Sequence, residues 1–302
     1  MDRLVEVDAH EGPVYVREEH ALYFTSLPQP GPRVDIKRLE LDTLTVSVVR
    51  ENAGAANGMA LDRDGQLVVC EQLGGALALV EPATGARTLL VDGFNSPNDV
   101  VVKSDGTIWF TDPSYGWLQG FRPEPLRPDG VHRCDPRTGE VVTVAESFDK
   151  PNGLCFSPDE SVLYVTDNGA GRHIKAFDVR DRGRLAGERV FAEFEPGHPD
   201  GIKVDSDGCV YASCPGGVRI LDPAGNPSGE IELPGAVNFC FGGPERDVLF
   251  ITSDTAIHAT HLPAKGPAPW PSSGPAPSST MPAHPPSSPP PRSTRTRAVT
   301  AS

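Results

Sequence analysis

Basic charge is scarce in this chain of 302 residues. Lysine and arginine together number 27 against 41 aspartates and glutamates, so the formal net charge is −14 at pH 7. Nucleic acids and anionic membranes bind to basic surfaces, and this balance argues against both as main partners. Long apolar runs are also missing, since no window approaches the roughly 20 residues that span a bilayer. The N-terminus, MDRLVEVDAHEGP, lacks the basic and apolar regions of a secretory signal.

Paired cysteines and several catalytic motifs are missing too. The six cysteines are scattered, without a C-x-x-C pair, and most stand in apolar, strand-like runs that are typical of buried thiols. Because disulfides belong mainly to secreted proteins, we expect a cytoplasmic protein without them. The sequence contains no G-x-S-x-G, H-E-x-x-H or phosphate-binding glycine loop. Serine hydrolases, zinc proteases and nucleotide-binding enzymes therefore lack support.

Helical periodicity is absent over long stretches, and the chain consists mainly of short apolar runs separated by Gly, Pro and Asp, which predicts an all-β fold. Six segments repeat one pattern, as in NDVVVKSDGTIWFTD and DGIKVDSDGCVYASC. Each has an oxygen-bearing side chain, a short strand, an acidic residue seven positions on and a second apolar strand. They begin at positions 11, 57, 98, 152, 200 and 238. This spacing predicts a six-bladed β-propeller over residues 1–263, with RLVEV (residues 3–7) as the closing strand of the last blade.

Two segments do not follow the repeat. Residues 113–130, PSYGWLQGFRPEPLRPDG, are rich in Pro, Gly and aromatic side chains, and we expect an ordered loop that covers a pocket as a lid. From residue 264 the chain is dominated by Pro, Ser and Ala. Such a composition cannot bury enough apolar surface to offset the entropy of ordering, so residues 264–302 are predicted to be a disordered tail.

One repeat position gathers oxygen-bearing side chains. The first residue of each innermost propeller strand lies near one mouth of the central channel, and here these residues are Glu11, Asn57, Asn98, Asn152, Asp200 and Asn238. A single Asn-Gly or Asp-Gly pair is usually a turn. However, four of the eight asparagines share this position, and Glu11 is not a turn former. Carboxylate and amide oxygens suit a hard divalent cation such as Ca²⁺, whereas Zn²⁺ would recruit His or Cys. We therefore predict a metal site in the channel.

The acidic residues at the seventh position lie at the opposite end of the strand. Asp64, Asp105 and Asp207 are each followed by glycine, as in a tight turn between two strands. We assign them to the turns and expect no catalytic role.

Four motifs together resemble a known family. EGPVY, SPNDVVVKSDGTIWFTDPSYG, KPNGLCFSPDESVLYVTDN and PDGIKVDSDG are similar, in order, to those of the gluconolactonase, regucalcin and luciferin-regenerating-enzyme-like family, over about residues 5–262. The resemblance implies a six-bladed propeller with one divalent metal in the channel. It implies that Glu11, Asn152 and Asp200 are metal ligands, and that Asn98 contacts the substrate or the metal and its water shell. Asp200 also matches the catalytic acid/base. Ser96 stands where animal members carry a substrate-binding Arg, so the substrate that this position selects stays open.

Together, the residues and the resemblance predict a metal-dependent hydrolase that opens a lactone, with a sugar lactone as the expected substrate. We expect one Ca²⁺, with Zn²⁺, Mg²⁺ or Mn²⁺ as alternatives. The cation would polarise the carbonyl, Asp200 would activate water, and Asn98 and Ser96 would contact the substrate. Two alternatives stay open, because propellers host many functions. One is hydrolysis of phosphotriesters or aryl esters, and the other is a non-catalytic propeller that binds Ca²⁺ or a partner protein.

Overall fold

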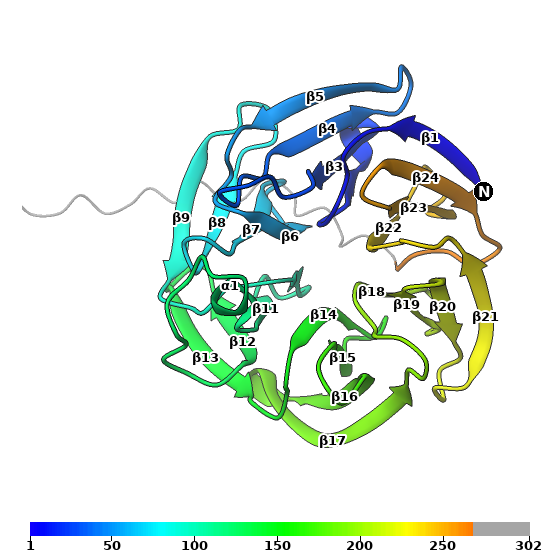
Figure 1. Cartoon of the computed structure of the whole chain (residues 1–302). Helices are drawn as coiled ribbons and strands as arrows, with labels where there is room; N and C mark the ends of the chain where they lie inside the picture. Colours follow the sequence, from blue (N-terminus) through cyan, green and yellow to red (C-terminus); the bar gives the residue numbers. More distant parts are fainter. Residues whose placement is uncertain (268–302) are drawn as a thin grey trace, which may run out of the picture. The chain divides into compact units, whose positions relative to one another are not determined.

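Six four-stranded antiparallel sheets surround a central axis in the computed structural model, which describes residues 1–267 (Figure 1). The first three blades are β2 (Val14–Val16), β3 (Ala21–Thr25), β4 (Ile36–Glu40) and β5 (Thr45–Arg50); β6 (Ala56–Leu61), β7 (Leu67–Glu71), β8 (Ala76–Val80) and β9 (Arg87–Asp92); and β10 (Val100–Val102), β11 (Ile108–Asp112), β12 (Gly130–Asp135) and β13 (Glu140–Ala145). The last three are β14 (Pro151–Phe156), β15 (Val162–Asp167), β16 (His173–Arg180) and β17 (Arg184–Glu193); β18 (Ile202–Val204), β19 (Val210–Cys214), β20 (Gly217–Leu221) and β21 (Pro227–Glu232); and β22 (Asn238–Gly242), β23 (Val248–Thr252), β24 (Ala256–His261) and β1 (Asp2–Glu6). This architecture confirms the predicted six-bladed propeller.

The ring closes through its N-terminal strand. β1 runs antiparallel to β24, with Asp2 opposite Ala259 and Glu6 opposite Ala256, and Figure 1 shows the two strands side by side at the rim. The closing strand lies one residue earlier than the predicted RLVEV segment. Because β24 would otherwise expose an edge, this pairing leaves the sixth sheet complete.

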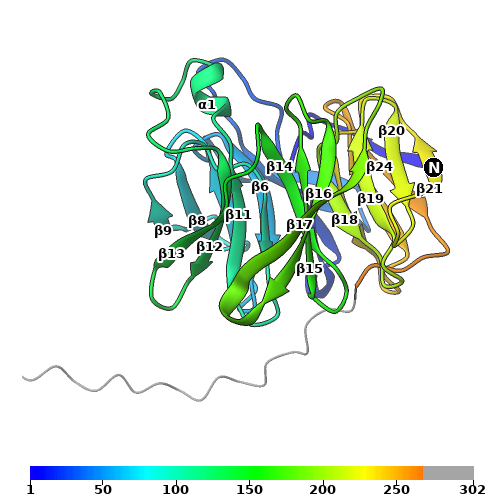
Figure 2. The ribbon, with the colours of Figure 1, turned by 90° about the horizontal axis from the view of Figure 1, so that it is seen from below.

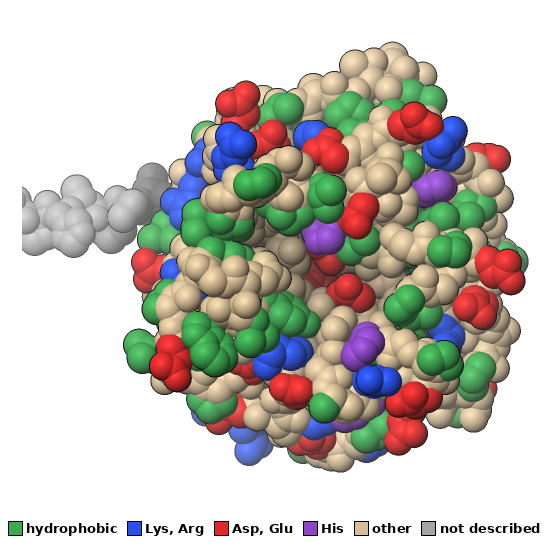
Figure 3. All heavy atoms as spheres, viewed as in Figure 1, with side chains coloured by type: hydrophobic (Ala, Val, Ile, Leu, Met, Phe, Trp, Pro, Cys, Tyr) green, Lys and Arg blue, Asp and Glu red, His purple; other side chains and the backbone are tan. Residues whose placement is uncertain are grey.

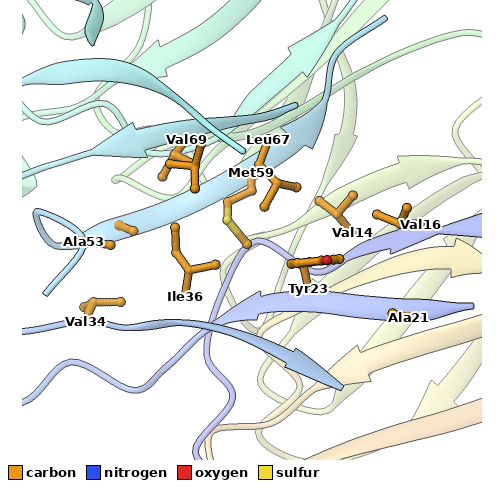
Figure 4. Packing of buried hydrophobic residues seen from close by; sticks show 12 residues of the cluster. Val14, Val16, Ala21, Tyr23, Val34, Ile36, Ala53, Met59, Leu67 and Val69 are labelled. Carbon is orange, nitrogen blue, oxygen red and sulfur yellow. The ribbon is translucent and has the colours of Figure 1, made fainter. Parts of the chain in front are cut away.

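Apolar layers between the blades hold the ring together. Between the first two blades, Tyr23 and Ile36 pack with Met59, Leu67 and Val69, all at most 5% exposed (Figure 4). Burying a side chain of this size contributes about 1.5–3 kcal/mol. Outer strands such as β5 and β13 contain only exposed and partly buried positions, because they lie at the rim and border solvent.

The turns at the seventh repeat position match the expectation. Gly65, Gly106 and Gly208 have φ angles of 81°, 87° and 88°, in the left-handed region that favours glycine. In the turn before Gly208, one carboxylate oxygen of Asp205 accepts hydrogen bonds from the backbone N–H groups of Asp207 and Cys209, each at 2.9 Å. These Asp-Gly pairs are therefore structural.

Helices are few and short in the part of the chain that the structure describes: the 3₁₀ turns η1 (Arg17–Glu19) and η2 (Asp181–Gly183), and α1 (Tyr115–Leu118). None of them is long and apolar enough to cross a membrane. Helix α1 belongs to the 113–130 segment and stands outside the strand ends on one face of the propeller (Figure 2).

The chain keeps contact with the propeller beyond the predicted boundary at residue 263. The backbone N–H of Gly266 donates to Arg246 O at 2.8 Å, and that of Ser206 donates to Lys265 O at 2.7 Å. The rest of the predicted disordered tail, residues 268–302, lies outside the described residues.

Candidate functional site

The six residues of the predicted ring stand where the innermost strands begin. Glu11, Asn57, Asn98, Asn152 and Asn238 are at most 8% exposed, and Asp200 is partly exposed. Contacts between neighbouring blades join them: Asn238 Nδ2 donates to Glu11 Oε2 at 2.7 Å, and Asn57 Nδ2 donates to Asn98 O at 3.0 Å. On this face, acidic and histidine side chains gather around the centre of the propeller (Figure 3).

The glycine that follows three of these ring residues is not a turn residue. Gly58, Gly153 and Gly201 have no left-handed φ angle, but each lies against the ring residue of the next blade. A Cβ atom at Gly153 would stand 2.4 Å from Asp200 O, and one at Gly201 would stand 2.4 Å from Asn238 Oδ1. The usual turn interpretation of these Asn-Gly and Asp-Gly pairs is therefore wrong. The inner strands need glycine because they approach one another closely.

In five of the six blades a hydroxyl group stands near the end of the second strand, and in β11 and β15 it holds the backbone of the next ring residue. Thr111 Oγ1 donates to Asn152 O at 2.7 Å, and Thr166 Oγ1 donates to Asp200 O at 2.8 Å. The equivalent repeat positions are Thr25, Cys70, Thr111, Thr166, Ser213 and Thr252. This contact was not predicted, although Thr or Ser recurs at this position in five of the six repeats of the sequence.

The ring brings several carboxyl groups close together and leaves some of their oxygens without a hydrogen-bond partner. Burial, together with the charge of Asp99, raises the pKa of the Glu11 carboxyl. Burial and the charge of Glu11 raise the pKa of Asp200. Among the described residues, Asn98 Oδ1, Asp99 Oδ2 and Asp200 Oδ1 are buried oxygens without a hydrogen-bond partner. Buried acceptors without partners are costly, and a bound cation would satisfy them.

Asp99 was not among the predicted site residues. It is 3% exposed, and its Oδ2 lies 3.9 Å from Lys203 Nζ, so one positive charge offsets this third carboxylate. The signal was present in the motif SPND, where an acid follows the ring asparagine in place of the glycine of most other repeats.

The donor set fits a hard divalent cation. Within residues 1–267, no three His, Cys, Asp or Glu side chains are arranged to hold a metal ion. The ring instead combines the carboxylates of Glu11 and Asp200 with the amides of Asn98 and Asn152. All of these donors are oxygen-bearing side chains, as Ca²⁺ prefers.

Two histidines lie near the ring. His10 Nδ1 is 2.6 Å from Asp254 Oδ1. Burial acts to lower the pKa of His10, but the hydrogen bond to Asp254 and the charge of Glu11 outweigh it and raise this pKa. His198 Nδ1 donates to Asn168 O at 2.9 Å, a contact within the loops.

Ser96 does not face the channel. It is fully buried, its hydroxyl donates to Pro113 O at 2.7 Å, and the same oxygen accepts the backbone N–H of Gly116 at 2.9 Å. Both hydrogen bonds tie the loop that carries α1. The predicted substrate contact of Ser96 thus has no free hydroxyl to make it, and the residue holds the loop instead.

The 113–130 loop reaches the ring through Tyr115. The Tyr115 hydroxyl oxygen accepts a hydrogen bond from Asn152 Nδ2 at 3.4 Å. Burial and the charge of Asp200 raise the pKa of Tyr115. The Arg122 guanidinium fastens the loop by donating to Leu73 O, Phe94 O and Asn95 O at 2.8–3.0 Å.

Comparison with known proteins gives a consistent result. Residues 9–255 match the family model described as SMP-30/Gluconolactonase/LRE-like region. The chain is 31% identical to a gluconolactonase of Zymomonas mobilis, over 82% of this chain and 77% of that protein. It is 32% identical to a lactonohydrolase of Aspergillus oryzae, over 87% of this chain and 70% of that protein. The solved structure of a gluconolactonase from Xanthomonas campestris superposes with a TM-score of 0.79 at 34% identity, covering 86% of this chain and 89% of that one.

Proposed function

The chain belongs to the SMP-30/gluconolactonase/LRE-like family, and we propose that it is a lactonase-type hydrolase that opens a sugar lactone with the help of one divalent cation. Relatives named gluconolactonase and lactonohydrolase support the lactone as the class of substrate. Ca²⁺ is the best candidate for the cation, because the ring offers oxygen ligands alone. A cytoplasmic location agrees with the six free cysteines.

One observation carries the metal dependence. The carboxyls of Glu11 and Asp200, both with raised pKa values, share the channel mouth with buried oxygens that have no partner, on Asn98 and Asp200. A fold that keeps acids in this state needs a positive charge beside them. Glu11, Asn152 and Asp200, with Asn98, would hold the cation. When bound, the cation supplies Lewis-acid polarisation of the lactone carbonyl and charge stabilisation of the developing oxyanion.

Asp200 acts as the general base and then as the general acid of the proposed reaction. Its Oδ1 has no hydrogen-bond partner and can accept a proton from the water that attacks the lactone carbonyl carbon. As the carbon–oxygen bond of the ring breaks, the leaving ring oxygen takes this proton, and the product is the open hydroxy acid. Thr166 Oγ1 and Gly153 N donate to Asp200 O at 2.8 and 3.2 Å, and these bonds hold the backbone of the base in place.

The test compares Asp200 and Asp207, two aspartates of the same blade that are each followed by glycine. Asp200→Asn should abolish Ca²⁺ binding in a calorimetric titration and lower the turnover of a hydroxylated lactone by about 10²–10⁴-fold, the usual contribution of a general base. Asp207→Asn, in the exposed outer turn before Gly208, should change neither. The proposal fails if Asp200→Asn binds Ca²⁺ and hydrolyses lactones like the wild type.

A substrate panel separates the alternatives. Lactones, an aryl ester and a phosphotriester are offered to chelator-treated protein with and without added Ca²⁺. We expect Ca²⁺-dependent turnover of lactones in preference to the other two. Faster turnover of the phosphotriester or the aryl ester would move the assignment to that chemistry. Ca²⁺ binding without turnover of any compound would indicate a non-catalytic propeller.

A further inference from the structure

Tyr115 brings an unused hydrogen-bond donor to the ring. Its hydroxyl oxygen accepts from Asn152 Nδ2, but its own hydrogen has no acceptor among residues 1–267. Two of the other four tyrosines do use theirs: Tyr23 donates to Glu19 at 2.7 Å, and Tyr211 donates to Asp205 at 3.2 Å. A phenol keeps its proton at neutral pH, so Tyr115 remains a donor. Its side chain is only partly buried, which leaves it accessible to a ligand.

The loop does not need this hydroxyl to stay in place. Ser96 binds the backbone on both sides of Tyr115, at Pro113 and Gly116, and Arg122 fastens the loop to three carbonyl groups. Ser114 Oγ adds a bond to Asp129 Oδ2 at 3.0 Å. These anchors fix the position of Tyr115 without help from its own hydrogen. A braced side chain that ends in a free donor beside a site is suited to bind a ligand.

The direction of approach decides which part of the ligand it meets. Glu11, Asn98, Asn152 and Asp200 surround the channel mouth, where the ester reacts under the proposed function. Helix α1 instead stands outside the ends of the inner strands (Figure 2), so Tyr115 comes to the ring from the solvent side. A donor placed there would face the part of a bound lactone that lies away from the channel mouth, where ring hydroxyl groups are available as acceptors.

We propose that Tyr115 is a specificity-determining residue: it donates a hydrogen bond to a hydroxyl group of the lactone and thereby selects hydroxylated lactones over unsubstituted ones. This inference rests on the proposed lactonase function. When an unsubstituted lactone binds, it displaces the water that was hydrogen-bonded to the donor but offers no acceptor in its place. Sites of this kind discriminate strongly against the analogue that lacks the hydroxyl.

The experiment compares Tyr115→Phe with the wild type on two six-membered lactones, a polyhydroxylated one and unsubstituted δ-valerolactone. We expect kcat/KM for the hydroxylated lactone to fall about tenfold, the usual effect of one hydrogen bond, and kcat/KM for δ-valerolactone to change less than about twofold. Trp117→Phe, at an exposed position of the same helix, is the control and should leave both values unchanged.

A binding measurement gives a second readout without turnover. The polyhydroxylated lactam of the same ring size resists hydrolysis, and calorimetry should show about tenfold weaker binding of it to Tyr115→Phe than to the wild type. Equal losses on both lactones would mean that Tyr115 acts on the ester, and no loss on either would leave it a purely structural residue; both results overturn the inference. If the wild type opens no lactone at all, the proposed function fails, which is a distinct outcome.

Discussion

Replacing Gly153 by alanine tests how closely the inner strands approach one another. A Cβ atom at this position in β14 would lie 2.4 Å from Asp200 O, 2.9 Å from Ile202 N and 3.1 Å from Gly201 Cα. All three neighbours are backbone atoms, which cannot rotate away as a side chain can. To restore an ordinary contact of 3.4 Å, the two strands must separate by about 1 Å.

The cost follows from these contacts. Overpacking of a well-packed region costs about 1–3 kcal/mol. The hydrogen bond from Gly153 N to Asp200 O, 3.2 Å long, would stretch further and lose part of its roughly 1 kcal/mol. Alanine lowers the entropy of the unfolded chain and returns about 0.4–1 kcal/mol. We expect a net loss of about 2 kcal/mol in the free energy of unfolding, which lowers Tm by about 4–8 °C in a domain of this size.

Gly229→Ala is the matched control. Gly229 also lies within a strand, β21, without a left-handed φ angle, but a Cβ atom there would meet nothing closer than Ile220 Cδ1 at 3.5 Å. In urea unfolding, Gly153→Ala should shift the midpoint without changing the slope, and Gly229→Ala should stay within about 0.5 kcal/mol of the wild type. Gly153→Ala should also weaken Ca²⁺ binding, because it displaces the backbone of Asp200. Equal stability of the two variants would refute the close-approach explanation.

Three further predictions concern charge, the loop and the thiols. Burial and the Glu11 charge raise the pKa of Asp200 to about 8, against about 3.9 in an unfolded chain. Between these values the chelator-treated folded protein retains a proton that the unfolded chain has lost, so its free energy of unfolding should fall from about pH 4 to pH 8. Asp200→Asn should make this slope smaller in urea titrations at several pH values, and the raised pKa of Glu11 accounts for a remaining part. Arg122→Ala removes three hydrogen bonds that fasten the 113–130 loop, so limited proteolysis should cut this loop faster and KM should rise, whereas Arg137→Ala on the exposed surface should behave like the wild type. Five cysteines are buried and burial raises the pKa of Cys209, so a thiol reagent should modify at most one group, slowly, in the native protein and six after unfolding; rapid reaction of several thiols in the native state would contradict the buried positions.

The sequence repeat predicted the fold because each blade is a local unit. Two adjacent strands joined by a turn with an acidic residue leave a pattern within about fifteen residues, and six copies of that pattern determine the number of blades. Even the closing strand could be located, since the last blade lacked a partner for β24 and the N-terminus offered an alternating segment. An error of one residue at β1 is small, because strand ends depend on weak terminal hydrogen bonds.

The ring residues could be predicted for the same reason. Glu11, Asn152 and Asp200 share a repeat position, and propeller symmetry converts an equal position into an equal height around the axis. The bonds of Ser96 could not be predicted, because a motif gives the place of a residue but not the direction of its hydroxyl, which here bonds to the loop at Pro113 and Gly116. The contact of Tyr115 with Asn152 was likewise invisible in the sequence, since it joins residues 37 positions apart.

The dipeptides Asp200-Gly201 and Asp207-Gly208 show what the sequence determines and what only the tertiary structure determines. The sequence by itself determined that the second pair is a turn, because the left-handed φ of Gly208 is a local property of four residues. Only the tertiary structure decided the meaning of the first. Gly201 is required by the side chain of Asn238 in the next blade, and Asp200 carries an unpaired oxygen in a ring of six blades. The close approach of Gly201 to Asn238 and the gathering of carboxylates at the channel mouth arise only when distant strands meet around one channel. For that reason no short stretch of the chain could reveal them.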